Sequence, residues 1–91
     1  MAKLIKTNGE EIEISPKNGT DFSLEELHDY VDGYIELVNL RSENNIMIVN
    51  EEGAINGMPV NLKASMIYSK AFNVNQCIYG DVVVCKSNMV K

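Results

Sequence analysis

The side chains best suited to catalytic chemistry are two cysteines, Cys77 and Cys85, and a single histidine, His28. A thiol nucleophile needs a base and an orienting group beside it in a pocket. Nothing in the sequence brings His28 near either cysteine, and Cys85 lies in a valine-rich run where burial makes a thiol unreactive. Zinc sites need a denser set of cysteines and histidines. We therefore expect a protein that is not an enzyme, with no catalytic residues, no cofactor and no bound metal.

Adjacent carboxylates offer a second possible chemistry, the binding of a cation. Glu51 and Glu52 are neighbours, and the side-chain oxygens of Asn50 and Asn56 could complete a ligand set. Their spacing departs from an EF-hand loop, which places acidic or amide groups at alternate positions and ends on a glutamate. The run from Asn50 to Gly53 instead fits a type I turn whose carboxylates point into water, and we favour the turn.

These residues open a longer run, residues 50–61, which we call the 50–61 stretch. It contains two glycines, one proline and three asparagines, which specify turns through backbone conformation rather than bulk. Two interpretations stay open: a surface that binds something, or a connection that only steers the chain from a strand into a helix. If the stretch binds, we expect an exposed contact set around it, consisting of Tyr34, Glu36, Glu51, Glu52, Asn56 and Asn61.

Local signals predict the elements before the stretch. Residues 3–14 form a hairpin with Asn8-Gly9 as a two-residue loop, a register that places Ile5 opposite Ile12. A helix begins after Ser23, which forms a capping box with Glu26, and it ends at Gly33 in a left-handed conformation. Residues 34–38 and 46–49 form a second antiparallel hairpin.

A second helix over residues 62–70 follows the stretch, with Asn61 as its N-cap, and the last strand covers residues 77–86. Residues 86–91 are expected to be a loose tail. The sequence thus predicts one domain over residues 1–91, of the α+β class and in the order β-β-α-β-β-α-β. Its sheet is mostly antiparallel, with a helix packed on one face.

Composition and charge limit the classes of partner. The chain of 91 residues has a formal net charge of −5 and a pI near 4.7, which argues against nucleic-acid binding because that usually needs a basic patch. No run of about 18 apolar residues is present, and the N-terminus does not resemble a signal peptide. We expect a cytoplasmic protein with no membrane contact.

The sequence also resembles a small uncharacterised family. Residues 32–36 match its GGYIE-like segment, with Asp32 replacing the first glycine, residues 50–61 match its NEEG-x-x-NG-x-P-x-N segment, and Gly80-Asp81 matches the step before its last strand. That family is a domain of unknown function found in bacteriophages, prophages and mobile elements of gut bacteria. The resemblance implies a phage or prophage origin, a host bacterial cytoplasm as location, and no particular activity.

The function we predict is therefore binding of a host protein by a non-enzymatic phage or mobile-element protein, such as a counter-defence inhibitor. The alternative is a protein that binds or sequesters a small, nucleotide-like ligand, although few cationic groups are available for phosphate. A third interpretation is a homo-oligomer in which a strand pairs across a two-fold axis.

Overall fold

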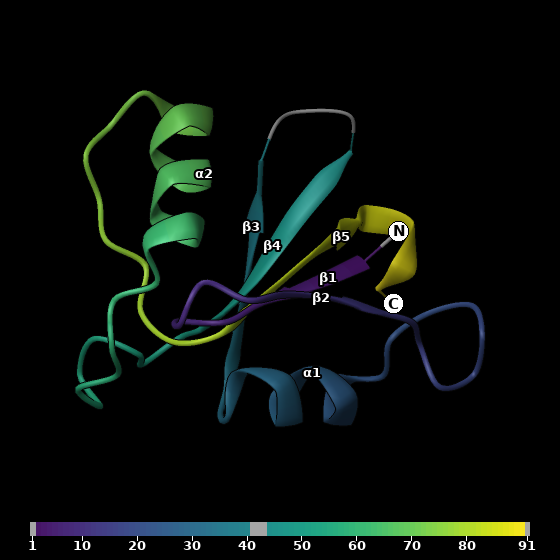
Figure 1. Cartoon of the computed structure of the whole chain (residues 1–91). Coiled ribbons are helices and arrows are strands. Elements are labelled where there is room, and N and C mark those ends of the chain that lie inside the picture. The colour runs from purple at the N-terminus through teal and green to yellow at the C-terminus, as the bar shows by residue number, and fades with distance from the viewer. Residues whose placement is uncertain (1, 41–43, 91) are drawn as a thin grey trace.

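The computed structural model describes residues 2–40 and 44–90. Within these residues the strands are β1 (Ala2–Ile5), β2 (Glu11–Ile14), β3 (Ile35–Asn39), β4 (Asn45–Asn50) and β5 (Val82–Lys86), and the α-helices are α1 (Leu24–Val31) and α2 (Leu62–Phe72). All strands pair antiparallel, in the order β2-β1-β5-β4-β3 (Figure 1). The predicted α+β class and element order are confirmed.

A helix covers each face of the sheet (Figure 1). Successive residues of a strand point to opposite faces. In β4, Ile48 therefore packs in one apolar cluster with Leu27 of α1, whereas Met47 packs in the other with Ala64 of α2. The apolar run of β4 is explained by burial on both sides. The helix predicted on one face is α1, and α2 adds a layer on the opposite face.

The first hairpin has a different register from the predicted one. Leu4, rather than Ile5, lies opposite Ile12, because the loop contains three residues and Lys6 N–H donates to the Glu10 carbonyl at 2.8 Å. A two-residue type I′ loop requires positive φ at both central positions, and of its two expected residues only Gly9 has it, at +95°. The predicted register is wrong, and Ile5 faces α2.

The capping box of α1 is confirmed by reciprocal bonds between Ser23 and Glu26. The predicted end of this helix is off by one residue. Asp32, with φ 60° and ψ 48°, adopts the left-handed cap conformation in place of Gly33. Gly33 is needed for a different reason, since a Cβ atom there would lie 2.7 Å from the Nδ2 atom of Asn50.

In the C-terminal half, the last strand is shorter and the second helix is longer than predicted. β5 spans Val82–Lys86 rather than residues 77–86, and α2 ends at Phe72 rather than at residue 70. Asn61 is the N-cap of α2, as expected, and α2 spans 11 residues. No helix in residues 2–40 and 44–90 is long and apolar enough to cross a membrane. The tail expected to be loose packs against the domain: Ser87–Met89 form a 3₁₀ helix, and the Met89 carbonyl accepts a hydrogen bond of 2.7 Å from Phe22 N–H. Lys91 lies outside the described residues.

Candidate functional site

The 50–61 stretch is fixed at its start by the side chain of Asn50. This buried amide donates from Nδ2 to the carbonyls of Val31 and Asp32, at 3.0 and 3.2 Å, and so satisfies the C-terminal end of α1. Its Oδ1 accepts from Glu52 N–H at 2.8 Å. Gly53 N–H donates to the Asn50 carbonyl at 3.2 Å, so a β-turn is present at the predicted position. The Asn50 oxygen, once considered as a cation ligand, is already used within the fold.

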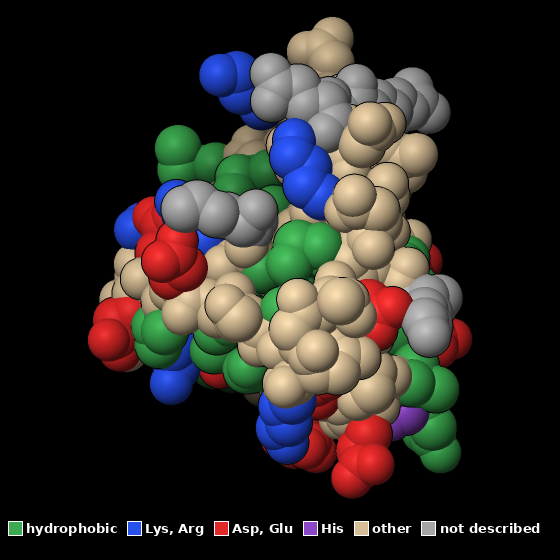
Figure 2. All heavy atoms as spheres, turned by 90° about the vertical axis from the view of Figure 1, so that its right-hand side faces the viewer, with side chains coloured by type: hydrophobic (Ala, Val, Ile, Leu, Met, Phe, Trp, Pro, Cys, Tyr) green, Lys and Arg blue, Asp and Glu red, His purple; other side chains and the backbone are tan. Residues whose placement is uncertain are grey.

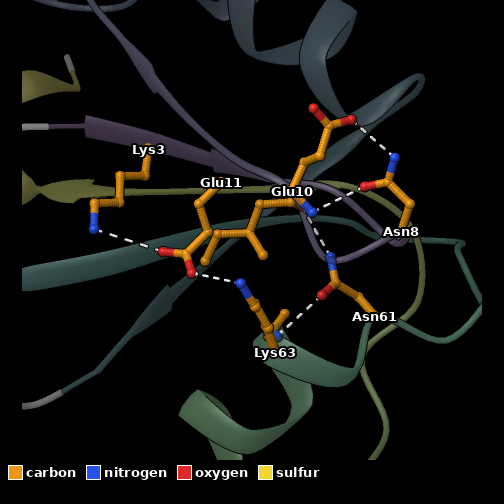
Figure 3. A network of polar contacts seen from close by, with 8 residues as sticks. Lys3, Asn8, Glu10, Glu11, Asn61 and Lys63 are labelled. Carbon is orange, nitrogen blue, oxygen red and sulfur yellow. Dashed lines mark hydrogen bonds and ion pairs between the residues drawn. The ribbon is translucent and has the colours of Figure 1, made fainter.

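Asn61 fixes the other end of the stretch. Its Oδ1 accepts from Ala64 N–H at 3.0 Å, which is the cap of α2. Its Nδ2 donates at 2.9 Å to the carbonyls of Ile5 and Gly80, so one amide joins α2, β1 and the segment before β5. Figure 3 shows Asn61 at the start of α2, directed toward the β1–β2 hairpin. Asn61 is 0% exposed. The prediction that Asn61 belongs to an exposed contact set is therefore wrong.

Between these two asparagines the stretch packs on the segment that precedes β5. Gly80 N–H donates to the Pro59 carbonyl at 2.8 Å, and Val60 forms an isolated antiparallel bridge with Tyr79. Gly53 is buried against Tyr79, where a Cβ atom would lie 3.0 Å from the Tyr79 carbonyl oxygen. A side chain at position 53 would therefore force the two backbones apart by a few tenths of an ångström.

The tip of the stretch, residues 54–57, projects into solvent. Its backbone is hydrogen-bonded, because Asn56 N–H donates to the Glu52 carbonyl at 2.8 Å. Ile55 is 83% exposed, and Asn56 is exposed beside it. Ile55 was not among the predicted contact residues, because an apolar residue without periodic neighbours gives no sequence signal of burial or exposure. Single exposed apolar side chains are common on protein surfaces, and what distinguishes Ile55 is its place on a tip whose backbone is already hydrogen-bonded.

Four of the predicted contact residues gather at the base of this tip. Glu51 and Glu52 are exposed, and Glu51 N–H donates to the Tyr34 carbonyl at 2.9 Å. Tyr34 is 66% exposed, with its ring centroid 5.9 Å from that of His28 in an edge-to-face arrangement. Glu36 is exposed on the α2 side of β3. Asn56 lies further out at the tip, and Asn61 is the one member buried away from the others.

A shallow depression of about 190 Å³ adjoins the base of the stretch. Glu36 and Glu51 line it, together with Cys77 and Tyr79. Its lining includes no lysine or arginine, so an anionic ligand would meet carboxylates there. On the face shown in Figure 2, acidic, basic and apolar side chains are interspersed.

The two cysteines lie in different environments. Cys77 is exposed, whereas Cys85 is buried in β5, and burial raises the pKa of the Cys85 thiol to about 11. A thiol with so high a pKa is a poor nucleophile at neutral pH. His28 contacts Tyr34 on the α1 side of the domain. Among the described residues, no group of three or more histidine, cysteine or acidic side chains could hold a metal ion.

Comparison with curated proteins and with solved structures finds no match. A family model does match, and it covers residues 1–89, which include both asparagine anchors and every element of the fold. Its description is a domain of unknown function, DUF3846. The match extends far beyond half of the chain, and this chain therefore belongs to the DUF3846 family.

Proposed function

We propose that this chain is a non-enzymatic binding protein that acts through contact with another protein. The observation that supports this function best is Ile55, which is 83% exposed at the tip of a connection fixed at both ends by buried asparagine amides. Because the backbone beneath it is already ordered, a partner that covers Ile55 would bear little cost in lost conformational freedom. Burial of one isoleucine side chain is worth about 1.5–3 kcal/mol.

The exposed groups at the base of the tip, together with Ile55, define what the partner surface would look like. Glu51 and Glu52 add two exposed carboxylates, and Tyr34 offers an apolar ring with a hydroxyl group. Aromatic residues are enriched in interfaces, and rim charges favour association with surfaces of opposite sign. The complementary surface would be a small apolar pocket bordered by basic side chains.

The origin and setting of this interaction follow from the resemblance to phage and mobile-element proteins. In the proposal, the partner is a protein of the bacterial host, met in the host cytoplasm. The mechanism is occlusion, in which the compact acidic domain covers a functional surface of that protein. Inhibition of a host defence protein is the form of occlusion we favour.

The alternative, a protein that sequesters a nucleotide-like ligand, receives less support. Phosphate is bound by cationic side chains or by converging backbone N–H groups. The depression beside the stretch is lined instead by Glu36 and Glu51. A panel of nucleotides in a thermal-shift assay discriminates the two functions, because a ligand that binds the folded state must raise the midpoint of unfolding.

The protein-binding proposal is tested by capture from bacterial lysate, followed by calorimetry with the purified partner. Two variants address the contact surface: Ile55→Asp, and the double variant Glu51→Lys with Glu52→Lys. We expect each to weaken partner binding by about tenfold or more, the effect of losing roughly 1.4 kcal/mol at an interface. All three positions are exposed, so the midpoint of thermal unfolding should stay close to that of the parent protein.

The matched control is a double variant that introduces the same change of charge in α1. Glu25 and Asp29 are exposed there, and Glu25→Lys with Asp29→Lys alters the net charge as much as the double variant in the stretch. This control should retain the affinity of the parent protein. Equal partner affinity for the parent, Ile55→Asp and the Glu51/Glu52 double variant would refute the proposed contact surface.

A further inference from the structure

The two edges of the sheet differ in how they are protected. β2 and β3 are the edge strands. The β2 edge carries Glu11, whose carboxylate lies 3.5 Å from Lys3 Nζ and 2.7 Å from Lys63 Nζ (Figure 3). Pro16 follows this strand. Charged side chains and prolines prevent edge-to-edge association. β3, with the sequence Ile-Glu-Leu-Val-Asn, has a single charge and neither lysine nor proline.

The hydrogen bonds of β3 show which backbone groups face outward. At its two ends, the Tyr34 carbonyl accepts from Glu51 N–H at 2.9 Å, and Leu40 N–H donates to the Asn45 carbonyl at 3.0 Å. Both bonds run inward to β4 or its continuation, in the same register as the strand pairing. Inward and outward bonding alternate along an antiparallel strand, so Leu37, at the middle of β3, directs its N–H and carbonyl to the free edge.

A mainly apolar groove, whose lining also includes Asn18, Asp21 and Ser23, adjoins this edge on the α1 face. It has a volume of about 390 Å³, and Leu37 and Ile35 of β3 line one side of it. Leu24 and Leu27 of α1 line the other side. Leu37 is 51% exposed and Leu24 is 62% exposed, so two large apolar side chains face water beside an open edge. Surfaces of this kind mark sites of association.

We propose that the β3 edge pairs with the β3 edge of a second copy of this chain, antiparallel and about a two-fold axis at Leu37. In this register the Leu37 N–H of each copy donates to the Leu37 carbonyl of the other. The two sheets then form one continuous sheet of ten strands, five from each copy. Leu37 of both copies meets at the axis, where the two apolar grooves adjoin.

The side-chain pattern of β3 favours the β3 strand of a second copy as its pairing partner. With the axis at Leu37, Glu36 lies opposite Val38 of the second copy, and Ile35 lies opposite Asn39 of the second copy. No carboxylate is therefore directly opposite a carboxylate, which would destabilise the pair. Symmetric contacts of one patch with itself are the commonest arrangement in homodimers. This dimer goes beyond the proposed partner binding, since the tip of the 50–61 stretch takes no part in it.

The oligomeric state tests the pairing. By light scattering after size exclusion, the mass of the parent protein should rise from 10.2 kDa toward twice that value as its concentration increases. Leu37→Lys should hold the mass at 10.2 kDa at every concentration, with an unchanged far-ultraviolet dichroism spectrum. The matched control is Ile12→Lys, which places the same charge on the other edge strand at a residue that is 39% exposed, and it should still dimerise. A parent protein that remains monomeric throughout would overturn the proposal.

Cross-linking tests the register. In a Cys77→Ser background, Leu37→Cys places two thiols at residues whose Cα atoms would lie about 5.5 Å apart, within the range that a disulfide spans. We expect an oxidised dimer of this variant on a non-reducing gel. Val38→Cys should not cross-link, because Val38 lies opposite Glu36 of the second copy and points to the α2 face. Cross-linking through position 38 but not 37 would refute an axis at Leu37.

Discussion

Asn61 offers the most direct test of how the 50–61 stretch is held. Asn61→Ala removes an N-cap, which is worth about 1 kcal/mol. It also leaves the buried carbonyls of Ile5 and Gly80 without their 2.9 Å donors, at a cost of about 1–2 kcal/mol each. The expected loss in the free energy of unfolding is therefore about 3–5 kcal/mol, a large part of the 5–15 kcal/mol that is typical of a small domain. Asn61→Asp separates the two contributions, since its carboxylate still accepts from Ala64 N–H but cannot donate to either carbonyl.

Urea denaturation followed by far-ultraviolet dichroism measures these changes. Burial beside two carbonyls should raise the pKa of the introduced carboxyl group in the folded state of Asn61→Asp. Its destabilisation relative to the parent protein should then be smaller at pH 4 than at pH 7, where folding forces a buried charge. Asn56→Ala is the control at an exposed asparagine of the same stretch, with an expected change within about 0.5 kcal/mol. A loss below about 1 kcal/mol for Asn61→Ala would show that only the helix cap matters, and it would refute the role of the two donor bonds.

Two further predictions concern titratable groups. In the native protein at pH 8, only the Cys77 thiol should react with a thiol-specific reagent, because Cys85 is buried and its pKa is raised to about 11. In denaturant, both thiols should react. Rapid labelling of Cys85 in the native protein would contradict this prediction. Backbone hydrogen bonds from Ser23 and Lys17 lower the pKa of the Glu26 carboxyl group below the ordinary value of 4.5. The contribution of this group to stability is therefore present above pH 4.5 and is lost as the pH falls through the folded-state pKa. Glu26→Gln should therefore lose less stability on acidification than the parent protein, as measured by urea denaturation between pH 6 and pH 3, and identical pH profiles would contradict the assignment.

Elements defined by neighbouring residues could be predicted from the sequence. The capping box of Ser23 and Glu26 and the cap at Asn61 are interactions between residues three apart, so their signals are local. The register of the first hairpin could not be derived in this way. Asn8-Gly9 fits both a two-residue and a three-residue loop, and the longer loop is stabilised by Thr7 N–H, which donates to Asp81 at 2.9 Å across 74 positions in the chain.

The position of the turn-rich connection could be predicted because turn residues are easy to locate in a sequence. The exposed positions of Glu51, Glu52 and Asn56 agree with the expectation that a specified turn displays its polar side chains. The burial of Asn61 could not be predicted by such reasoning. Its role as an N-cap involves only neighbouring residues. Its burial depends on the carbonyl of Ile5, which lies 56 positions away in the sequence and is brought next to Asn61 only when the sheet forms. Ile55 was overlooked for a related reason: burial cannot be assigned to an apolar residue that has no periodic neighbours.

The two buried asparagines also have a consequence for engineering. Asn50 and Asn61 tie the ends of the stretch to α1 and to β1, and these ties use none of the side chains at positions 54–57. The free energy of loop closure rises only slowly with loop length, so a longer segment can replace this tip without disturbing either tie. A peptide grafted between Gly53 and Met58 would be displayed with its ends held at a fixed separation. The domain thus has the properties of a small display scaffold, in which the exchanged sequence and the structural frame are physically separate.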